Sequence, residues 1–291
     1  MIQARIANIN FRGEFADKPF FERRFSQYTV DGFDNPDMSV CVKHDVISQM
    51  PKGEMLTQYK SIRLFKTCEH EKTLAFSTPN KDIYMIRRFT DDYSRVDISI
   101  NPDVAHPVFS LTDREYMAVT DSLSLRAACM GGCMLHASSL RINNCGIAFS
   151  AISGTGKSTQ TGLWQQYFGD RVTMINDDRP AIFYDDDTAM IYGTPFSGKT
   201  DINNNISAPL RAIIFLTQAS ECSIKRLDTA TAYHQLANQI WRPIYDQNVS
   251  VMMLDILERL IKTVPIYMLY CDISNTAVET VYNEIFGGWE I

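Results

Sequence analysis

The sequence predicts an α/β fold, a mixed sheet that contains a glycine-rich loop, preceded by a β-rich N-terminal region. Up to about residue 110, short segments rich in β-branched and aromatic residues alternate with turn clusters such as "DNPD". From Cys133 onward, apolar segments of strand length alternate with segments of helical periodicity. The run "SGTGKST" joins one such strand to one such helix. We therefore expect two parts, residues 1–125 and residues 126–291.

The first part is expected to form a twisted antiparallel sheet. A helix should follow over 112–130, because Thr112 at the N-cap and Glu115 at the third helical position match a capping box. The pair Gly131-Gly132 should end this helix. The candidate strands cover 5–11, 25–33, 38–44, 59–67, 72–78, 82–89 and 95–100.

The second part is expected to alternate strands and helices. It should begin with a hairpin over 133–152 that turns at Asn143-Asn144, and a second hairpin should turn around 185–187. A helix over 158–168 should follow the glycine-rich loop, and a strand over 171–176 should come next. The remaining elements are strands over 210–218, 222–228 and 265–272 and helices over 229–241, 247–262 and 276–286.

Composition narrows the function classes. With 291 residues, 45% of them hydrophobic, the chain can bury a sizeable core. Its 34 acidic residues outnumber its 28 basic ones, which gives no support for a nucleic-acid partner. No apolar run reaches the ~18 residues of a membrane helix, and the charged N-terminal residues do not resemble a signal peptide, so no membrane partner is expected.

The seven cysteines have no framework spacing. Cys129 and Cys133 stand four residues apart, but no second Cys/His pair lies near them in the sequence, so buried thiols are the better interpretation than a metal site. A reducing, cytoplasmic location is therefore expected.

A strand, a glycine-rich turn and a helix that starts with Lys-Ser form the arrangement that binds polyphosphate. Backbone N–H groups and the helix N-terminus attract phosphates, and the lysine reaches the terminal ones. On this interpretation Lys157 binds the β- and γ-phosphates and the Ser158 hydroxyl binds Mg²⁺. The usual pattern begins with glycine where this chain has Ala151, and alanine costs little there unless its φ must be positive. The alternative is a glycine-rich turn with a solvated lysine. The candidate loop residues are Ser153, Gly154, Thr155, Gly156, Lys157, Ser158 and Thr159.

Two adjacent carboxylates, Asp177 and Asp178, follow at the end of an apolar strand. One can accept a proton from an attacking hydroxyl while the other holds a metal ion, although a solvated Asp-Asp turn would have the same sequence. His136, on the strand before the loop, is either a structural residue or a neighbour of the phosphates. Further candidate cations are Lys199, Arg211, Arg226 and Arg242.

These motifs occur in a specific order: Leu135-His136, then Ser153 to Ser158, then Asp177-Asp178-Arg179. In this order they resemble the catalytic domain of HPr kinase/phosphorylase and, more distantly, ATP-dependent phosphoenolpyruvate carboxykinase. The close resemblance covers about residues 130–185. It implies a P-loop within a mixed sheet and a site for ATP and Mg²⁺. It also implies that Asp177 takes the proton from a serine hydroxyl, that Lys157 and His136 assist at the phosphates, and that Ser158 binds Mg²⁺.

One part of the family pattern has no counterpart here. HPr enzymes carry a Glu-x-Arg-Gly stretch whose glutamate helps to hold the metal, whereas this chain has "YGTPFSGKTD" in that region. Asp178 is therefore expected to carry more of the metal binding, and the phosphorylase reaction is not implied. "GTPFSGK" followed by "PLRAIIFLTQ" resembles instead the smaller HPr-kinase-like proteins of peptide-modification clusters, some of which look like peptide serine kinases.

The leading hypothesis is an ATP- and Mg²⁺-dependent kinase that transfers the γ-phosphate to a serine of a small protein or peptide. Residues 1–125 would recognise that substrate or form contacts in a homo-oligomer, and their edge strands suit an extended peptide. Two alternatives stay open: a small-molecule kinase that uses the same site, and a nucleotide-gated binding protein that transfers little phosphate.

Overall fold

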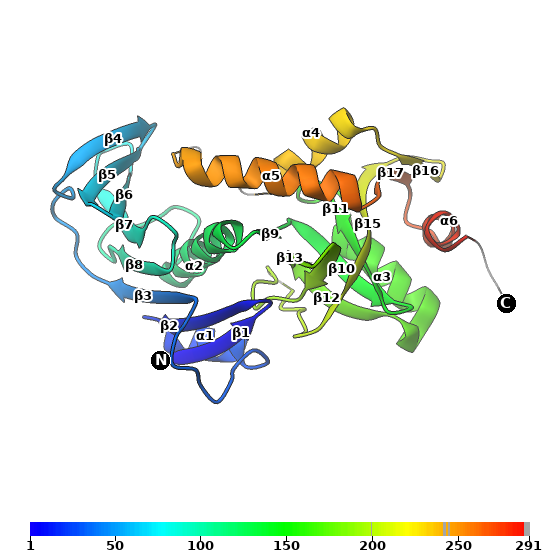
Figure 1. Cartoon of the computed structure of the whole chain (residues 1–291), viewed down its shortest axis with the longest axis horizontal. Coiled ribbons are helices and arrows are strands. Elements are labelled where there is room, and N and C mark those ends of the chain that lie inside the picture. Colours follow the sequence, from blue (N-terminus) through cyan, green and yellow to red (C-terminus); the bar gives the residue numbers. More distant parts are fainter. Residues whose placement is uncertain (199, 241–242, 244, 288–291) are drawn as a thin grey trace. The chain divides into compact units, whose positions relative to one another are not determined.

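The computed structural model describes residues 1–198, 200–240, 243 and 245–287. The chain forms two compact units (Figure 1). Unit 1 consists of Met1–Met130 and Pro243–Ser250, and unit 2 of Gly131–Arg242 and Val251–Ile291. Instead of a single boundary near residue 125, the first unit thus contains a segment from late in the chain. Among the described residues, no helix has both the length and the apolar character of a membrane span.

Unit 1 is built on an eight-stranded sheet with the order β1-β2-β3-β8-β7-β6-β5-β4. The expectation of an antiparallel sheet was wrong at its centre, because β3 pairs in parallel with both β2 and β8. A parallel neighbour needs a long crossover, and a helix lies between β2 and β3 in the chain. The strands are β1 (Ile2–Ile6), β2 (Ile9–Glu14), β3 (Met38–His44), β4 (Glu54–Tyr59), β5 (Ile62–Cys68), β6 (Glu71–Ser77), β7 (Ile83–Thr90) and β8 (Arg95–Ile100).

Two of the expected strands were wrong in their extent. The segment 5–11 is a hairpin, since Ala7 adopts a left-handed φ of 50° between β1 and β2. The segment 25–33 forms only a single bridge at Thr29 and follows helix α1 (Lys18–Phe25). This helix begins at Asp17, whose side chain accepts a hydrogen bond from the Phe20 N–H, as an N-cap does.

Helix α2 (Leu111–Cys129) begins one residue earlier than expected, and its capping box was assigned to the wrong pair. Ser110 is the N-cap and Asp113 occupies the third position, with both reciprocal hydrogen bonds formed. Glu115 instead accepts hydrogen bonds from the backbone N–H groups of Ala16 and Asp17. Two pairs in this stretch have the spacing of a capping box, Ser110 with Asp113 and Thr112 with Glu115. The first pair forms the cap, because Glu115 is bonded to Ala16 and Asp17 instead.

The segment Pro243–Ser250 belongs to unit 1 through a buried carboxylate. Asp246 is 3% exposed, accepts a hydrogen bond of 3.2 Å from the Tyr93 hydroxyl and lies 3.8 Å from Lys72 Nζ. Helix α5 (Gln247–Thr263) starts within this segment and continues into the second unit.

Unit 2 contains a nine-stranded mixed sheet in which the long strand β15 joins two parts. The start of β15 pairs with β14, and its remainder pairs in parallel with β11 and β17. The strands are β9 (Cys133–Met134), β10 (Ala137–Ile142), β11 (Cys145–Ser150), β12 (Thr173–Asp178), β13 (Ala181–Asp185), β14 (Thr188–Tyr192), β15 (Ser207–Gln218), β16 (Ser223–Arg226) and β17 (Ile266–Cys271). The helical elements are α3 (Lys157–Phe168), the 3₁₀ turn η1 (Gly169–Arg171), α4 (Thr229–Gln239), α5 and α6 (Asn275–Phe286).

An apolar core fixes α3 and α6 to this sheet. Trp164 of α3 is fully buried and packs against Phe149 of β11 and Tyr282 of α6. The two hairpins turn where the sequence predicts: Asn143 and Asn144 have left-handed φ values, as does Asp186. All seven cysteines are free.

Strand register brings the chemically interesting residues to one end of the sheet. Ala137 of β10 pairs with Ser150 of β11 on one side and with Asp178 of β12 on the other. Ser150 is the last residue of β11, and the glycine-rich loop follows it. The start of this loop and Asp178 therefore lie at the same level of the sheet, on either side of Ala137.

Gly193 allows the backbone of residues 202–204 to lie close to β12, next to the two aspartates. A Cβ atom at Gly193 would stand 1.9 Å from the Asn204 carbonyl oxygen and 2.9 Å from that of Ile175. Neither atom can retreat easily, because each belongs to a hydrogen-bonded backbone.

We predict that Gly193→Ala lowers the free energy of unfolding by about 1–3 kcal/mol or more, as overpacking does. Gly162→Ala is the matched control, since a Cβ there meets nothing within 4 Å and α3 should gain about 0.5–1 kcal/mol. Denaturant titration of the two variants measures the difference. Equal stability of the two variants would contradict the close approach at Gly193.

Candidate functional site

The glycine-rich loop connects β11 to α3 through left-handed backbone. Gly154 and Gly156 have φ values of 84° and 115°, which side chains with a Cβ rarely adopt, and Gly156 is the N-cap of α3. Ala151 is buried and is not among the described residues with positive φ. The departure from glycine at this position is therefore free of backbone strain.

Lys157, the first residue of α3, folds back over the loop. Its Nζ donates a hydrogen bond of 3.1 Å to the Ala151 carbonyl oxygen. Burial lowers the pKa of Lys157, and the charge of Arg179 acts in the same direction, whereas Asp178 and Asp177 oppose it. The ammonium group is thus close enough to both carboxylates to feel their charge.

Asp177 links the helix to the end of β12. Its carboxylate accepts hydrogen bonds from the Ser158 hydroxyl, with Oγ at 2.8 Å from Oδ1 and 3.0 Å from Oδ2. The Thr200 hydroxyl donates a third hydrogen bond to Oδ2, at 2.8 Å. The residue is 8% exposed and its backbone N–H is bound to the Ile202 carbonyl. A buried carboxylate with two hydroxyl neighbours is a cluster of hard oxygen ligands.

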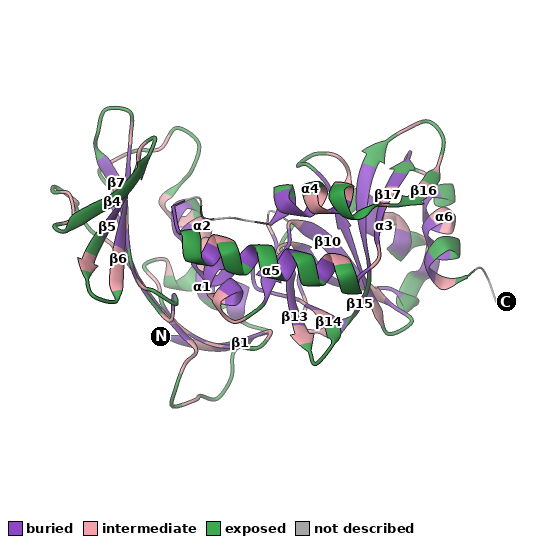
Figure 2. Ribbon diagram, turned by 45° about the horizontal axis from the view of Figure 1, so that its top comes forward, coloured by how far each residue is buried: buried purple, intermediate pink, exposed green. Residues whose placement is uncertain are grey.

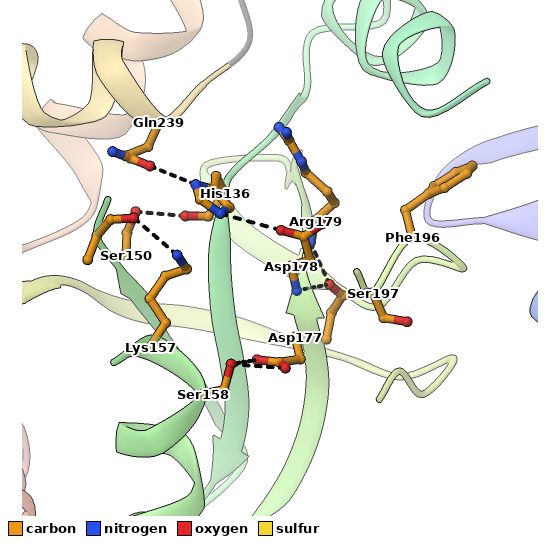
Figure 3. Close-up of polar contacts among 12 residues, drawn as sticks. His136, Ser150, Lys157, Ser158, Asp177, Asp178, Arg179, Phe196, Ser197 and Gln239 are labelled. Carbon is orange, nitrogen blue, oxygen red and sulfur yellow. Dashed lines mark hydrogen bonds and ion pairs between the residues drawn. The ribbon is translucent and has the colours of Figure 1, made fainter. Parts of the chain in front are cut away.

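His136 lies between Gln239 of α4 and Asp178 (Figure 3). Its Nδ1 is 2.9 Å from Gln239 Oε1, and its Nε2 is 3.5 Å from Asp178 Oδ1. Because the amide oxygen faces Nδ1, this nitrogen carries the proton of the neutral ring and Nε2 presents a lone pair. Nε2 and the Asp178 carboxylate are then two acceptors that face each other, and a single added proton would bridge them.

The pKa of His136 is lowered, mainly by burial and then by the charge of Lys157; Arg179 also lowers it, while Gln239 and Asp178 raise it. The ring is therefore neutral at pH 7, since its pKa lies below the usual 6.5.

The backbone around Asp178 is held by Asn176 and Gly198. Asn176 Oδ1 accepts hydrogen bonds from the N–H groups of Asp178 and Arg179, at 2.9 and 2.7 Å. Gly198 has a φ of 62°, and a Cβ there would stand 3.2 Å from Asp178 Cβ. The orientation of this carboxylate is thus set by its neighbours on both sides.

Two pockets flank the loop within unit 2. One, of about 490 Å³, is lined by Ala151 to Thr155 and reaches Gln239. The other, of about 720 Å³, lies beside Thr155 and Thr159 and has Leu216 and Ile273 in its walls. A phosphate chain on the loop would have room on either side.

The structure gathers several of the residues that the sequence singled out. Of the loop residues Ser153 to Thr159, Ser158 is bonded to Asp177, and Lys157 is near both carboxylates and His136. The partner of Ser158 is Asp177, whereas Asp178 was the aspartate expected on the metal side. Arg211 donates to the Ile285 carbonyl, and Arg226 is an exposed residue of β16. Lys199 and Arg242 lie outside the described residues.

Sequence reasoning missed two contributors. Thr200 stands in the stretch "YGTPFSGKTD", in which the sequence analysis singled out Lys199 but not the hydroxyl that follows it. Gln239 comes 103 residues after His136, and a glutamine in a helix gives no local sign of such a contact.

Neither a protein-family model nor a curated protein matches the chain. Among solved structures, it is similar to the Hpr(Ser) kinase/phosphatase from Coxiella burnetii, at 14% identity and a TM-score of 0.31. The match covers 53% of this chain and 97% of that chain. A likeness of this size is too weak to carry a statement on function, so the site is judged on its own geometry.

We predict that His136 titrates below pH 6.5 and that Lys157→Met raises its pKa, because the substitution removes a nearby positive charge. The unfolded chain binds this proton more readily than the folded one, so His136 should make the protein less stable as pH falls below 6.5. NMR titration of the ring protons measures both effects. Lys262→Met, a change at an exposed lysine of α5, is the control, and an unchanged His136 pKa in Lys157→Met would contradict the arrangement.

Proposed function

We propose that unit 2 binds ATP with Mg²⁺ and transfers the γ-phosphate to a hydroxyl group, on a serine of a peptide or small protein. The observation that carries this proposal is the hydrogen bond of 2.8 Å between Ser158 Oγ and the Asp177 carboxylate. It joins the first turn of the helix after a glycine-rich loop to the end of a neighbouring strand. In P-loop enzymes, a hydroxyl and a carboxylate at these two places hold the metal ion.

The oxygen atoms around Asp177 fit Mg²⁺. This ion takes oxygen ligands, keeps several waters and often needs only one or two carboxylates besides the phosphates. The described residues contain no group of three His, Cys, Asp or Glu side chains that could form a closed metal cage, which agrees with such an open site. Ser158 and Asp177 would hold the ion, next to the Thr200 hydroxyl. When bound, Mg²⁺ would neutralise charge on the transferred phosphate.

The loop fits a triphosphate. Beside Gly154, a Cβ would meet nothing within 4 Å, so the backbone there faces open space. Lys157 would exchange the Ala151 carbonyl for the terminal phosphates, a stronger, charge-assisted partner. The pocket of about 720 Å³ with Leu216 and Ile273 in its walls suits the nucleoside.

The pair His136 and Asp178 is suited to accept the proton of the acceptor hydroxyl. A neutral imidazole with a free lone pair is a base, and the carboxylate at 3.5 Å would stabilise the ring once protonated. This exchanges the roles expected from the sequence, in which Asp177 was the base and Asp178 the metal ligand. The pocket of about 490 Å³ reaches Gln239, the other neighbour of His136, and is the place proposed for the acceptor.

A peptide acceptor is also compatible with unit 1. Strand β4 stands at the end of its sheet and is exposed along its full length (Figure 2). An edge of this kind can pair with an extended peptide through main-chain hydrogen bonds. It can equally pair with a second copy of the chain, so a homo-oligomer is compatible with the same edge.

A nucleotide-gated binding protein is the second candidate. It is favoured by the partners of Asp177, because both carboxylate oxygens already accept hydrogen bonds and a ligand must displace them. Nucleotide binding would then rearrange Ser158 and Thr200 even without phosphate transfer.

We predict that the full chain transfers label from γ-labelled ATP to one discrete peptide or protein in a lysate, in the presence of Mg²⁺. Asp178→Asn should lower this rate about 100-fold or more while ATP still binds, because the protonated His136 ring loses the carboxylate that would stabilise it. Asp177→Asn should weaken the dependence on Mg²⁺ as well as the rate. Asp187→Asn, at the exposed tip of the β13-β14 hairpin, is the matched control and should act like wild type.

The alternatives give different patterns in the same experiment. Label in a metabolite would indicate a small-molecule kinase. Equal labelling by wild type and both site variants, with ATP binding intact, would indicate the nucleotide-gated binding protein. ATP binding that survives Lys157→Ala unchanged would contradict all three proposals.

A further inference from the structure

Unit 1 contains a pocket with two buried arginines. Arg87 of β7 is 1% exposed and Arg114 of α2 is 6% exposed, and both line a cavity of about 200 Å³. The rest of the wall is mostly aromatic or apolar and includes Phe76 and Phe109. Buried arginines are rare unless they are paired, so the partners of these two groups decide what the pocket can hold.

Neither guanidinium group has all its donors satisfied by the described residues. Arg87 Nε and Nη1 and Arg114 Nε have no hydrogen-bond partner there, although each atom is buried. Arg87 Nη2 lies 3.7 Å from the Asp121 carboxylate, and the Arg87 side chain is also a hydrogen-bond neighbour of the Tyr245 hydroxyl. Arg114 Nη1 donates to the Val104 carbonyl at 3.0 Å. Unmet buried donors of this kind cost free energy that an added acceptor would recover.

The charges that line the pocket do not balance. Two arginines face one aspartate, Asp121, which leaves one positive charge in excess when His106 is neutral. Burial lowers the pKa of Arg114, the effect expected of a cation without a full counter-charge. The pocket therefore suits a ligand with a single negative charge.

His106 adds another donor. Its Nδ1 accepts hydrogen bonds from the Val108 and Phe109 N–H groups, at 3.2 and 3.1 Å. In the neutral ring the proton must then be on Nε2, which is a donor. The Phe109 ring is tilted against this ring, with centroids 4.8 Å apart, and the Arg87 guanidinium carbon lies 5.7 Å from the centroid of the Phe76 ring. The pocket thus has hydrogen-bond donors next to the apolar side chains of its wall.

We propose that this pocket binds a monocarboxylate with an apolar body, its carboxylate on Arg87 and Arg114 and its carbon skeleton against Phe76 and Phe109. The planar guanidinium group matches a carboxylate in shape and charge. Two sources share this chemistry: the free C-terminus of a peptide that ends in an apolar residue, and a small organic acid. The inference does not depend on phosphate transfer in unit 2.

The test is calorimetric titration of the full chain with benzoate and with 4-methylpentanoate. Benzamide is the neutral analogue and inorganic phosphate the more highly charged one. We expect benzoate or 4-methylpentanoate to bind at least about tenfold more tightly than benzamide, because the charge-assisted bonds are lost in the amide. Equal binding of acid and amide, binding of neither acid, or tighter binding of phosphate that Arg87→Met abolishes would overturn the proposal.

Variants locate the binding. Arg87→Met should weaken acid binding at least about tenfold and remain folded, because it replaces a partly unpaired buried charge with an apolar side chain of similar length. Arg114→Met should weaken it similarly. Arg88→Met is the matched control, since Arg88 is the exposed neighbour of Arg87 and lines a different pocket. Acid binding that survives both buried substitutions, or that only Arg88→Met removes, would refute this location. If Arg87→Met and Arg114→Met fail to fold, the difference in affinity between benzoate and benzamide for the wild-type protein still tests whether a carboxylate is recognised.

Peptides distinguish the two sources. A peptide that ends in leucine with a free C-terminus should displace benzoate if the natural ligand is a chain end, whereas its amidated form should not. Benzoate binding that neither peptide disturbs supports the small organic acid. Displacement by both peptides alike would count against carboxylate recognition.

Discussion

The hydrogen bond between Ser158 and Asp177 is the constraint on which the candidate site depends. It connects the first turn of α3 to the penultimate residue of β12, and hydrogen bonds to a charged group contribute about 1.5–3 kcal/mol. It exists only because β12 pairs with β10, and β10 with β11, in one specific register. A slip of one residue would turn Asp177 to the opposite face of the sheet and remove the contact.

The same register separates two kinds of chemistry on adjacent residues. Successive side chains of a strand point to opposite faces. Asp177 accordingly meets the hydroxyls of Ser158 and Thr200, whereas Asp178 meets His136. Asp177 and Lys157 already have hydrogen-bond partners within the protein. Binding of a polyphosphate, as proposed, would replace these contacts rather than fill an empty charged cavity. Its strength would then reflect the difference in free energy between the old contacts and the new ones.

Features with a local cause could be predicted from the sequence. The Asn143-Asn144 turn, the loop with Gly154 and Gly156, and the strand that ends in the two aspartates follow from side-chain preferences over a few residues. The partners of Asp177 and His136 could not be predicted in this way. Thr200 and Gln239 come from segments brought in by tertiary packing, and the parallel pairing of β3 depends on strands far apart in the chain.

The capping box of α2 illustrates the limit of pattern matching. Two pairs of residues in the same stretch satisfy the pattern, and only the contacts of Glu115 with Ala16 and Asp17 decide between them. The alternation of polar and apolar residues likewise marks β-rich and mixed regions, but it contains no sign that Pro243–Ser250 packs within unit 1.

That late segment determines how the protein can be taken apart. A fragment that starts at Gly131 would retain Asp246 but lose Tyr93 and Lys72, the groups that solvate its buried carboxylate. The matching N-terminal fragment would leave the Tyr93 hydroxyl without its Asp246 acceptor, while Lys72 would retain Asp91 at 3.1 Å as its carboxylate neighbour. To express the N-terminal fragment alone, residues 243–250 should be fused to it. To express the C-terminal fragment alone, the same residues should be replaced by a polar linker.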